Sequence, residues 1–231
     1  MGNLFRDMRS MSSRSILVVD DVRFTRLTLV RMLQRMSCDP VYEAEDGAAA
    51  LRVLADHAVD CVVSDLDMPN VNGLQLLKAI RSGTTRAARE IPVVFLTGHS
   101  ELEHLGPALL LDLDAFLAKP LSQQALDVCL QALFEKKFQR VFAEAGTYAQ
   151  VDLAPTVTER VGEVGAAGEA AAGREVPLGA VPANSVLARD LLYANGRLLL
   201  RAGSKLSPAI IDRLQDMAAL TDLAESVWIL E

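Results

Sequence analysis

The residues best suited to chemistry in this 231-residue chain are three carboxylates, a threonine and a lysine: Asp20, Asp21, Asp65, Thr97 and Lys119. Three carboxylates brought together repel one another unless a cation joins them, and oxygen ligands suit Mg²⁺. A carboxylate can also attack phosphorus and form an aspartyl phosphate. The transferred group then needs charge stabilisation, from a metal and a cation such as Lys119, and Thr97 could donate a hydrogen bond to it.

Each of these residues ends or follows a short apolar run that we interpret as a buried strand. The runs cover residues 16–19, 61–64, 92–96 and 115–118, and residues 41–44 are a further short strand candidate. Helical periodicity separates them, so the sequence predicts an α/β fold with a doubly wound, five-stranded parallel sheet over residues 15–135. Ligands bind such sheets at the carboxyl ends of the strands. We therefore expect the polar residues to gather at that edge.

Residues 15–135 resemble the receiver domain of two-component response regulators, which has a flavodoxin-like fold. The resemblance rests on the order and strand-end placement of several short motifs. They are Asp20-Asp21, Asp65, the run MPNVNG at 68–73, Thr97-Gly98, Phe116 and Lys119-Pro120. Each motif is a weak signal by itself, and their combination is specific.

The resemblance implies that Asp65 accepts a phosphoryl group from a histidine kinase or phosphotransfer protein. It also implies a Mg²⁺ ion held by Asp20, Asp21, Asp65 and the backbone carbonyl of Asp67. Lys119 would contact the phosphate, and its peptide bond to Pro120 would be cis. The resemblance further implies that the protein is not an enzyme, and that at most it catalyses the removal of its own phosphoryl group.

Thr97 and Phe116 would form the switch pair of the receiver. Many relatives have tyrosine at the position of Phe116, and phenylalanine lacks the hydroxyl group. We therefore expect Phe116 to switch through packing alone, and to alter contacts with a downstream protein.

The same residues allow two alternatives to this interpretation. Asp65-Leu66-Asp67 also resembles the nucleophile motif of haloacid-dehalogenase-type phosphatases, but in that family an acidic pair follows the lysine, whereas here Asp20-Asp21 come first. Isolated aspartates such as Asp46 and Asp60 are interpreted as turn or helix-cap residues. A phosphorelay intermediate or phosphate sink remains the alternative to a switch.

The rest of the chain divides by composition. Residues 1–14 form an N-terminal tail, and 136–149 extend the last helix with an apolar stripe (Phe138, Val141, Phe142) that suits a domain-edge or homodimer contact. Residues 150–180 include a run of glycine and alanine typical of a flexible linker.

Residues 181–231 are predicted to form a small α+β module, with a hairpin turn at Asn195-Gly196 and a helix capped by Ser207. The module resembles one found beside HD-GYP domains. The chain shows neither the HD nor the GYP motif, so we interpret the module as a protein-contact element.

Composition excludes other classes of function. The formal net charge is -7, and residues 15–135 hold 10 basic and 17 acidic residues, which accounts for the whole excess and argues against a nucleic-acid partner. No apolar run approaches the length of a membrane span. Three cysteines without metal-type spacing, and a first segment without a signal-peptide core, predict a cytoplasmic protein.

Overall fold

The computed structural model describes residues 13–98, 105–135, 142–153, 173–192, 198–220 and 226–230. The chain forms two compact units. The first unit combines residues 1–102 with 113–153, and the second combines residues 103–112 with 154–231.

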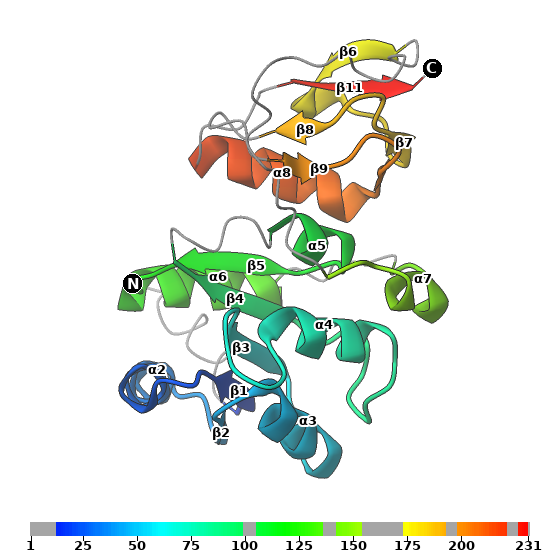
Figure 1. The fold of residues 1–231 in the computed structure, drawn as a ribbon. Coiled ribbons are helices and arrows are strands. Elements are labelled where there is room, and N and C mark those ends of the chain that lie inside the picture. Colours follow the sequence, from blue (N-terminus) through cyan, green and yellow to red (C-terminus); the bar gives the residue numbers. More distant parts are fainter. Residues whose placement is uncertain are drawn as a thin grey trace. The chain divides into compact units, whose positions relative to one another are not determined.

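A five-stranded parallel sheet organises the first unit (Figure 1). Its strands are β1 (Ile16–Val19), β2 (Val41–Ala44), β3 (Cys61–Asp65), β4 (Val93–Thr97) and β5 (Ala115–Ala118). They pair in the order β2-β1-β3-β4-β5, and every pair is parallel. The doubly wound sheet predicted from the sequence is confirmed. Because all strands run the same way, the residues that follow them meet at one edge.

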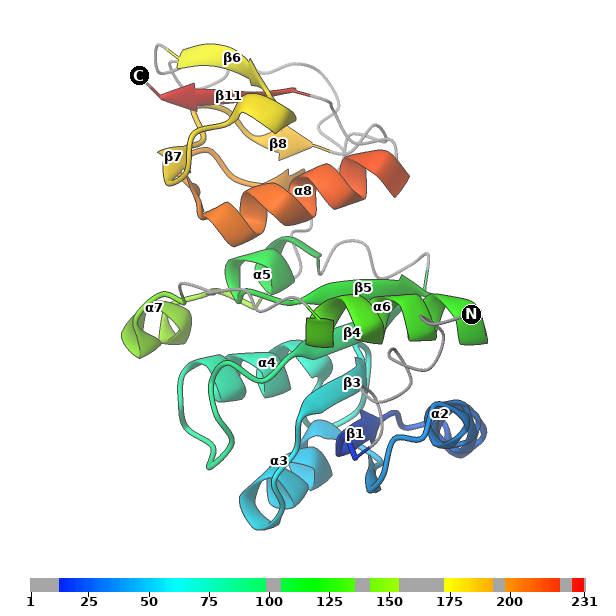
Figure 2. The same ribbon diagram turned by 180° about the vertical axis from the view of Figure 1, so that it is seen from behind.

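Helices cover both faces of this sheet. On one face, α2 (Arg23–Arg35) and α6 (Gln123–Glu135) contribute buried leucines to a core shared with β1, β3 and β4. On the other face lie α3 (Gly47–Asp56) and α4 (Gly73–Arg81) (Figures 1 and 2). All residues of β1, β3 and β4 are buried. Burial on both faces explains why these strands are continuous apolar runs in the sequence.

Asp46 and Asp60 have structural roles, as predicted. The Asp46 carboxylate caps α3 by accepting a hydrogen bond from the backbone N–H of Ala49 at 2.7 Å. The Asp60 carboxylate accepts hydrogen bonds from the backbone N–H and the hydroxyl group of Ser15, at 2.8 and 2.9 Å. These bonds satisfy backbone donors at a helix start and beside β1.

The predicted extension of the last helix over residues 136–149 is wrong in its second half. The helix α6 is described as far as Glu135, residues 142–144 are not helical, and a separate helix, α7, covers Ala145–Ala149. The α7 helix packs against α4, and the Arg81 guanidinium lies 5.1 Å from the centroid of the Phe142 ring. Phe138 and Val141 lie outside the described residues, so the homodimer contact stays a prediction.

The second unit contains one short helix from the middle of the chain and a small α+β module from its end (Figure 2). Its helical elements are α5 (Leu105–Leu110), η2 (Leu178–Ala180) and α8 (Pro208–Leu220). Its strands are β6 (Gly173–Pro177), β7 (Ser185–Val186), β8 (Leu191–Leu192), β9 (Leu198–Leu200), β10 (Lys205–Leu206) and β11 (Ser226–Leu230). They pair antiparallel as β6 with β11, β7 with β10, and β8 with β9.

The predicted linker over residues 150–180 ends earlier than expected. Gly173–Pro177 pairs along its whole length with β11, so residues 173–180 belong to the folded module. A Cβ atom at Gly173 would lie 2.5 Å from the Cβ of Ala188, so only glycine allows this close approach. Residues 154–172 lie outside the described residues, and for them the linker stays a prediction.

The module otherwise follows its local signals. The strands β8 and β9 flank Asn195-Gly196 as a hairpin would, although the turn lies outside the described residues. The Ser207 hydroxyl accepts a hydrogen bond from the Ile210 N–H at 3.2 Å and caps α8, as predicted. Among the described helices, none is long and apolar enough to span a membrane.

Candidate functional site

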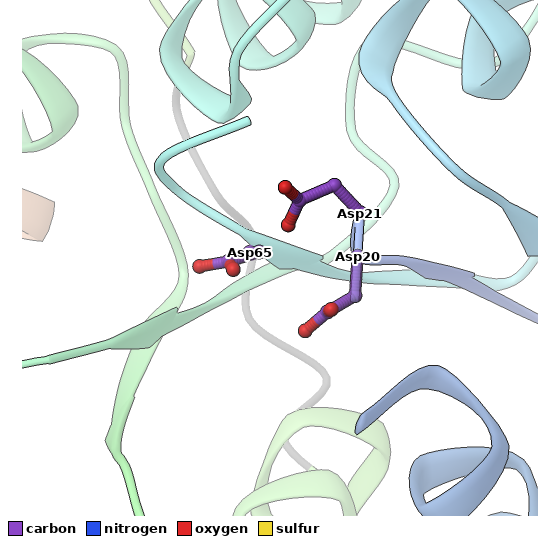
Figure 3. A group of neighbouring side chains, drawn as sticks. All are labelled: Asp20, Asp21 and Asp65. Carbon is purple, nitrogen blue, oxygen red and sulfur yellow. The ribbon is translucent and has the colours of Figure 1, made fainter. Parts of the chain in front are cut away.

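The three predicted carboxylates converge at the carboxyl edge of the sheet (Figure 3). Asp20 and Asp21 directly follow β1, and Asp65 is the last residue of β3, the neighbouring strand. One carboxylate oxygen from each residue lies within 4.8 Å of the others. The expected acidic pocket is therefore present in the structure, and its members come from two adjacent strand ends.

The Asp65 carboxylate is held by two donors and has only 6% of its side chain exposed. Its Oδ1 accepts a hydrogen bond from the Leu66 N–H at 2.7 Å, and its Oδ2 lies 2.7 Å from the Lys119 Nζ. The Lys119 backbone N–H donates to the Thr97 carbonyl oxygen at 2.9 Å, which fixes the lysine beside the end of β4. The Lys119-Pro120 peptide bond is cis, as predicted.

Asp20 is the member of the pocket that most needs a cation. Its side chain is fully buried, and burial raises the pKa of the Asp20 carboxyl to about 6. The negative charges of Asp65 and Asp21 also raise this pKa, while the hydrogen bond from Val22 and the charge of Lys119 lower it. Within the described part of the chain, its Oδ2 has no hydrogen-bond partner. A buried oxygen with a free lone pair, in an all-oxygen donor set, fits a hard divalent ion such as Mg²⁺.

The other predicted site residues lie around this pocket. Thr97 ends β4, directly after Leu96, which pairs with Asp65 in the sheet, and Thr97 is 8% exposed. Phe116 is half-buried in β5 and pairs in register with Phe95, with ring centroids 6.4 Å apart. Asp67 is exposed, two residues past β3. The use of its carbonyl as a ligand stays a prediction.

Two further residues position the site: Gly73, which belongs to the 68–73 motif quoted from the sequence, and Arg26, which was not singled out. Gly73 lets α4 begin directly against β3, because a Cβ atom there would lie 2.6 Å from the Asp65 carbonyl oxygen. Arg26 ties the end of β1 to β2, since its Nη1 donates to the Asp20 carbonyl oxygen at 2.7 Å and its Nε to Glu43 at 3.2 Å. Gly73 closes the 68–73 motif, which was a usable signal, whereas Arg26 looks like any helix-surface arginine.

Residues 16–131 match the family model of the response regulator receiver domain. The match covers half of the sequence, and the chain belongs to this family of two-component signalling proteins. The predicted receiver domain is confirmed, and the resemblance of the C-terminal module stays a prediction.

Its relatives include chemotaxis proteins. Chemotaxis protein CheY-3 of Vibrio cholerae is 31% identical over 121 residues, which are 52% of this chain and 92% of that protein. Chemotaxis protein CheY of Pseudomonas aeruginosa is 28% identical over 52% of this chain and 96% of its own length. A putative response regulator from Chloroflexus aurantiacus has the same fold, with a TM-score of 0.50 and 22% identity over 54% of this chain and all of that one.

Proposed function

We propose that this protein is a phosphorylation-dependent switch in which Asp65 accepts a phosphoryl group from a histidine kinase or phosphotransfer protein. The observation that supports this most directly is the pairing of Asp65 with Lys119 at 2.7 Å, next to the carboxylates of Asp20 and Asp21. A buried nucleophile between a fixed cation and a set of metal ligands matches what phosphoryl transfer requires.

The chemistry follows from these neighbours. A carboxylate oxygen of Asp65 attacks phosphorus as the bond between phosphorus and the donor nitrogen breaks, and the electron pair of that bond leaves with the donor. Lys119 neutralises charge on the phosphoryl oxygens, and Thr97 donates its hydroxyl hydrogen to one of them. Asp20, Asp21, Asp65 and the Asp67 carbonyl would hold Mg²⁺, which would supply further charge neutralisation.

The output that we propose is a change of protein contacts. Phe116 would repack against neighbours such as Phe95, and the altered surface would engage a downstream protein. In this proposal the chain has no catalytic output beyond self-dephosphorylation and no nucleic-acid partner. Its cysteines are free thiols, and Cys38 and Cys61 are buried, which suits the reducing cytoplasm in which we place the protein.

Intact-mass measurement tests the proposed phosphorylation site. Incubated with acetyl phosphate and Mg²⁺, the wild-type chain is expected to gain the mass of one phosphoryl group, and Asp65→Asn is expected to gain none. Asp56→Asn is the matched control, because Asp56 is exposed at the end of α3. Phosphorylation of Asp65→Asn to the wild-type level would refute the assignment.

A further inference from the structure

The helix α5 is apolar on every side. Its residues 105–110 read LGPALL, and in sequence they lie between β4 and β5. Residues 106–109 are buried, with Ala108 and Leu109 at 0% exposure, and Leu110 is partly buried. A helix without a polar face must be covered all round. The sequence of α5 therefore predicts that other residues also cover the side that would face solvent in a surface helix.

The second unit supplies that partner from its own elements. Within this unit, α5 contacts α8 and β9. The side chains of Ile210, Ile211 and Leu214 on α8 are 4%, 6% and 0% exposed. Leu199 and Leu200 of β9 are each 2% exposed. The apolar helix thus belongs to a core that is built mostly from the end of the chain.

A charge pair joins the end of α5 to α8. Asp112 Oδ1 lies 3.7 Å from Arg213 Nη1, and the two side chains are only 10% and 13% exposed. Asp112 has a φ of 51°, in the left-handed region that aspartate tolerates better than most residues. Removing one member of a largely buried pair weakens the compensation of the other charge, so the pair contributes to holding α5 in this unit.

We propose that the C-terminal part of the second unit is a built-in partner of α5 that opposes phosphorylation of Asp65. This packing belongs to the chain whose Asp65 carboxylate is still paired with Lys119. The segment that contains α5 joins the strand ending at Thr97 to the strand carrying Phe116. A change at Thr97 on phosphorylation must therefore be accommodated through α5, and whatever holds α5 resists that change. By linkage, loosening the second unit favours phosphorylation.

Hydrogen exchange of the full-length chain tests the packing. The amides of residues 109–112 are expected to exchange about tenfold faster or more in Arg213→Glu and in Asp112→Asn than in wild type, because each variant breaks the pair. Arg201→Glu is the matched control, since Arg201 is exposed in the same module. Emission of the single tryptophan, Trp228 in β11, reports whether that module is still folded.

The same proteins test the inhibition, which rests on the proposed function. With acetyl phosphate and Mg²⁺, Arg213→Glu and Asp112→Asn are expected to be phosphorylated several-fold faster than wild type and Arg201→Glu. Unchanged exchange at residues 109–112 in both variants would overturn the packing. Faster exchange with unchanged or slower phosphorylation would overturn the inhibition. Absence of phosphorylation in all four proteins would instead overturn the proposed function, and the exchange data would still decide the packing.

Discussion

A fully buried carboxylate with an unused lone pair costs stability unless it is protonated or meets a cation, and Asp20 is in this position. The pKa of Asp20, raised to about 6, shows that the folded chain disfavours its ionised form. Asp65 is compensated by Lys119 and Leu66, so the uncompensated charge is concentrated on the Asp20 side of the pocket. Because of this asymmetry, we expect a bound Mg²⁺ ion to compensate the charge on the Asp20 side of the pocket.

Mg²⁺ is expected to raise the melting temperature, because a ligand that binds only the folded state stabilises it by mass action. Asp21→Asn removes one carboxylate ligand and should shrink the difference between melts in millimolar Mg²⁺ and in chelator. Asp56→Asn, which alters an exposed carboxylate outside the pocket, should keep the wild-type difference. Equal shifts in wild type and Asp21→Asn would contradict the proposed ligand set.

The Asp46 carboxylate that caps α3 is predicted to make the stability of the fold decrease at low pH. Asp46 accepts hydrogen bonds from Ala49 and from Asn70, and these bonds lower its pKa below 3.8. A carboxylate with a depressed folded-state pKa stabilises the fold above its unfolded pKa, and this stability is lost as pH falls through the folded value. Asp46→Ala should therefore lower the melting temperature at pH 7, and by less at pH 3. A constant difference across this range would show that the charge has no part in the cap.

The candidate site was predictable at this scale because its residues are marked by position. Asp20, Asp65 and Thr97 each stand where an apolar run stops, and parallel strands bring such positions together. The support from Arg26 was not predictable, since an arginine six residues after Asp20 can equally point to solvent. Its contact with Glu43 depends on the pairing of β1 with β2, which no local pattern encodes.

At the scale of elements, a buried ion pair fixes the end of the first unit opposite the site. Arg81, at the end of α4, and Asp114, just before β5, lie 2.8 Å apart with both side chains at 0% exposure. Arg81 also donates to the carbonyl oxygens of Arg89 and Ile91, and Asp114 accepts from the Val93 N–H. The pair therefore joins α4 to the starts of β4 and β5.

Arg81→Met is expected to destabilise the chain by about 3–5 kcal/mol, because it leaves the Asp114 carboxylate buried and unpaired by its arginine. Arg86→Met is the control, as Arg86 is exposed in the loop that follows α4. Urea denaturation of both variants measures the difference. Equal, small losses of unfolding free energy would mean that water or a neighbouring group compensates Asp114.

The failed helix extension also belongs to this scale. Periodicity in residues 138–145 indicated an apolar stripe but not the surface that buries it. In the structure, the returning segment buries Tyr148, whose hydroxyl oxygen accepts a hydrogen bond from the Ala143 N–H at 2.8 Å. Lys78 of α4 donates to the Val151 carbonyl oxygen at 2.8 Å. Lys78 and Val151 are 73 residues apart in the sequence, so a local pattern could not predict that this segment packs against α4.

At the scale of the whole molecule, the position of α5 in the sequence and its packing assign it to different units, which composition alone did not reveal. The sequence placed α5 in the receiver, because it falls between two strands of the sheet, while its packing places it in the second unit. The missed signal was the absence of any polar residue over 105–110. If the second unit restrains α5 as proposed, its effect on Asp65 would not pass through residues 154–172.

Lengthening the chain within residues 154–172 tests whether the effect passes through this segment. If residues 154–172 form the predicted linker, doubling its length costs only about 0.6 kcal/mol, so an insertion of about twenty Gly/Ser residues should speed exchange at residues 109–112 by less than about threefold. Arg213→Glu, which breaks the packing itself, should speed it by about tenfold or more. The insertion should also leave phosphorylation by acetyl phosphate close to the wild-type rate. If it instead matched Arg213→Glu in both measurements, the connection and not the core around α5 would be what restrains the helix.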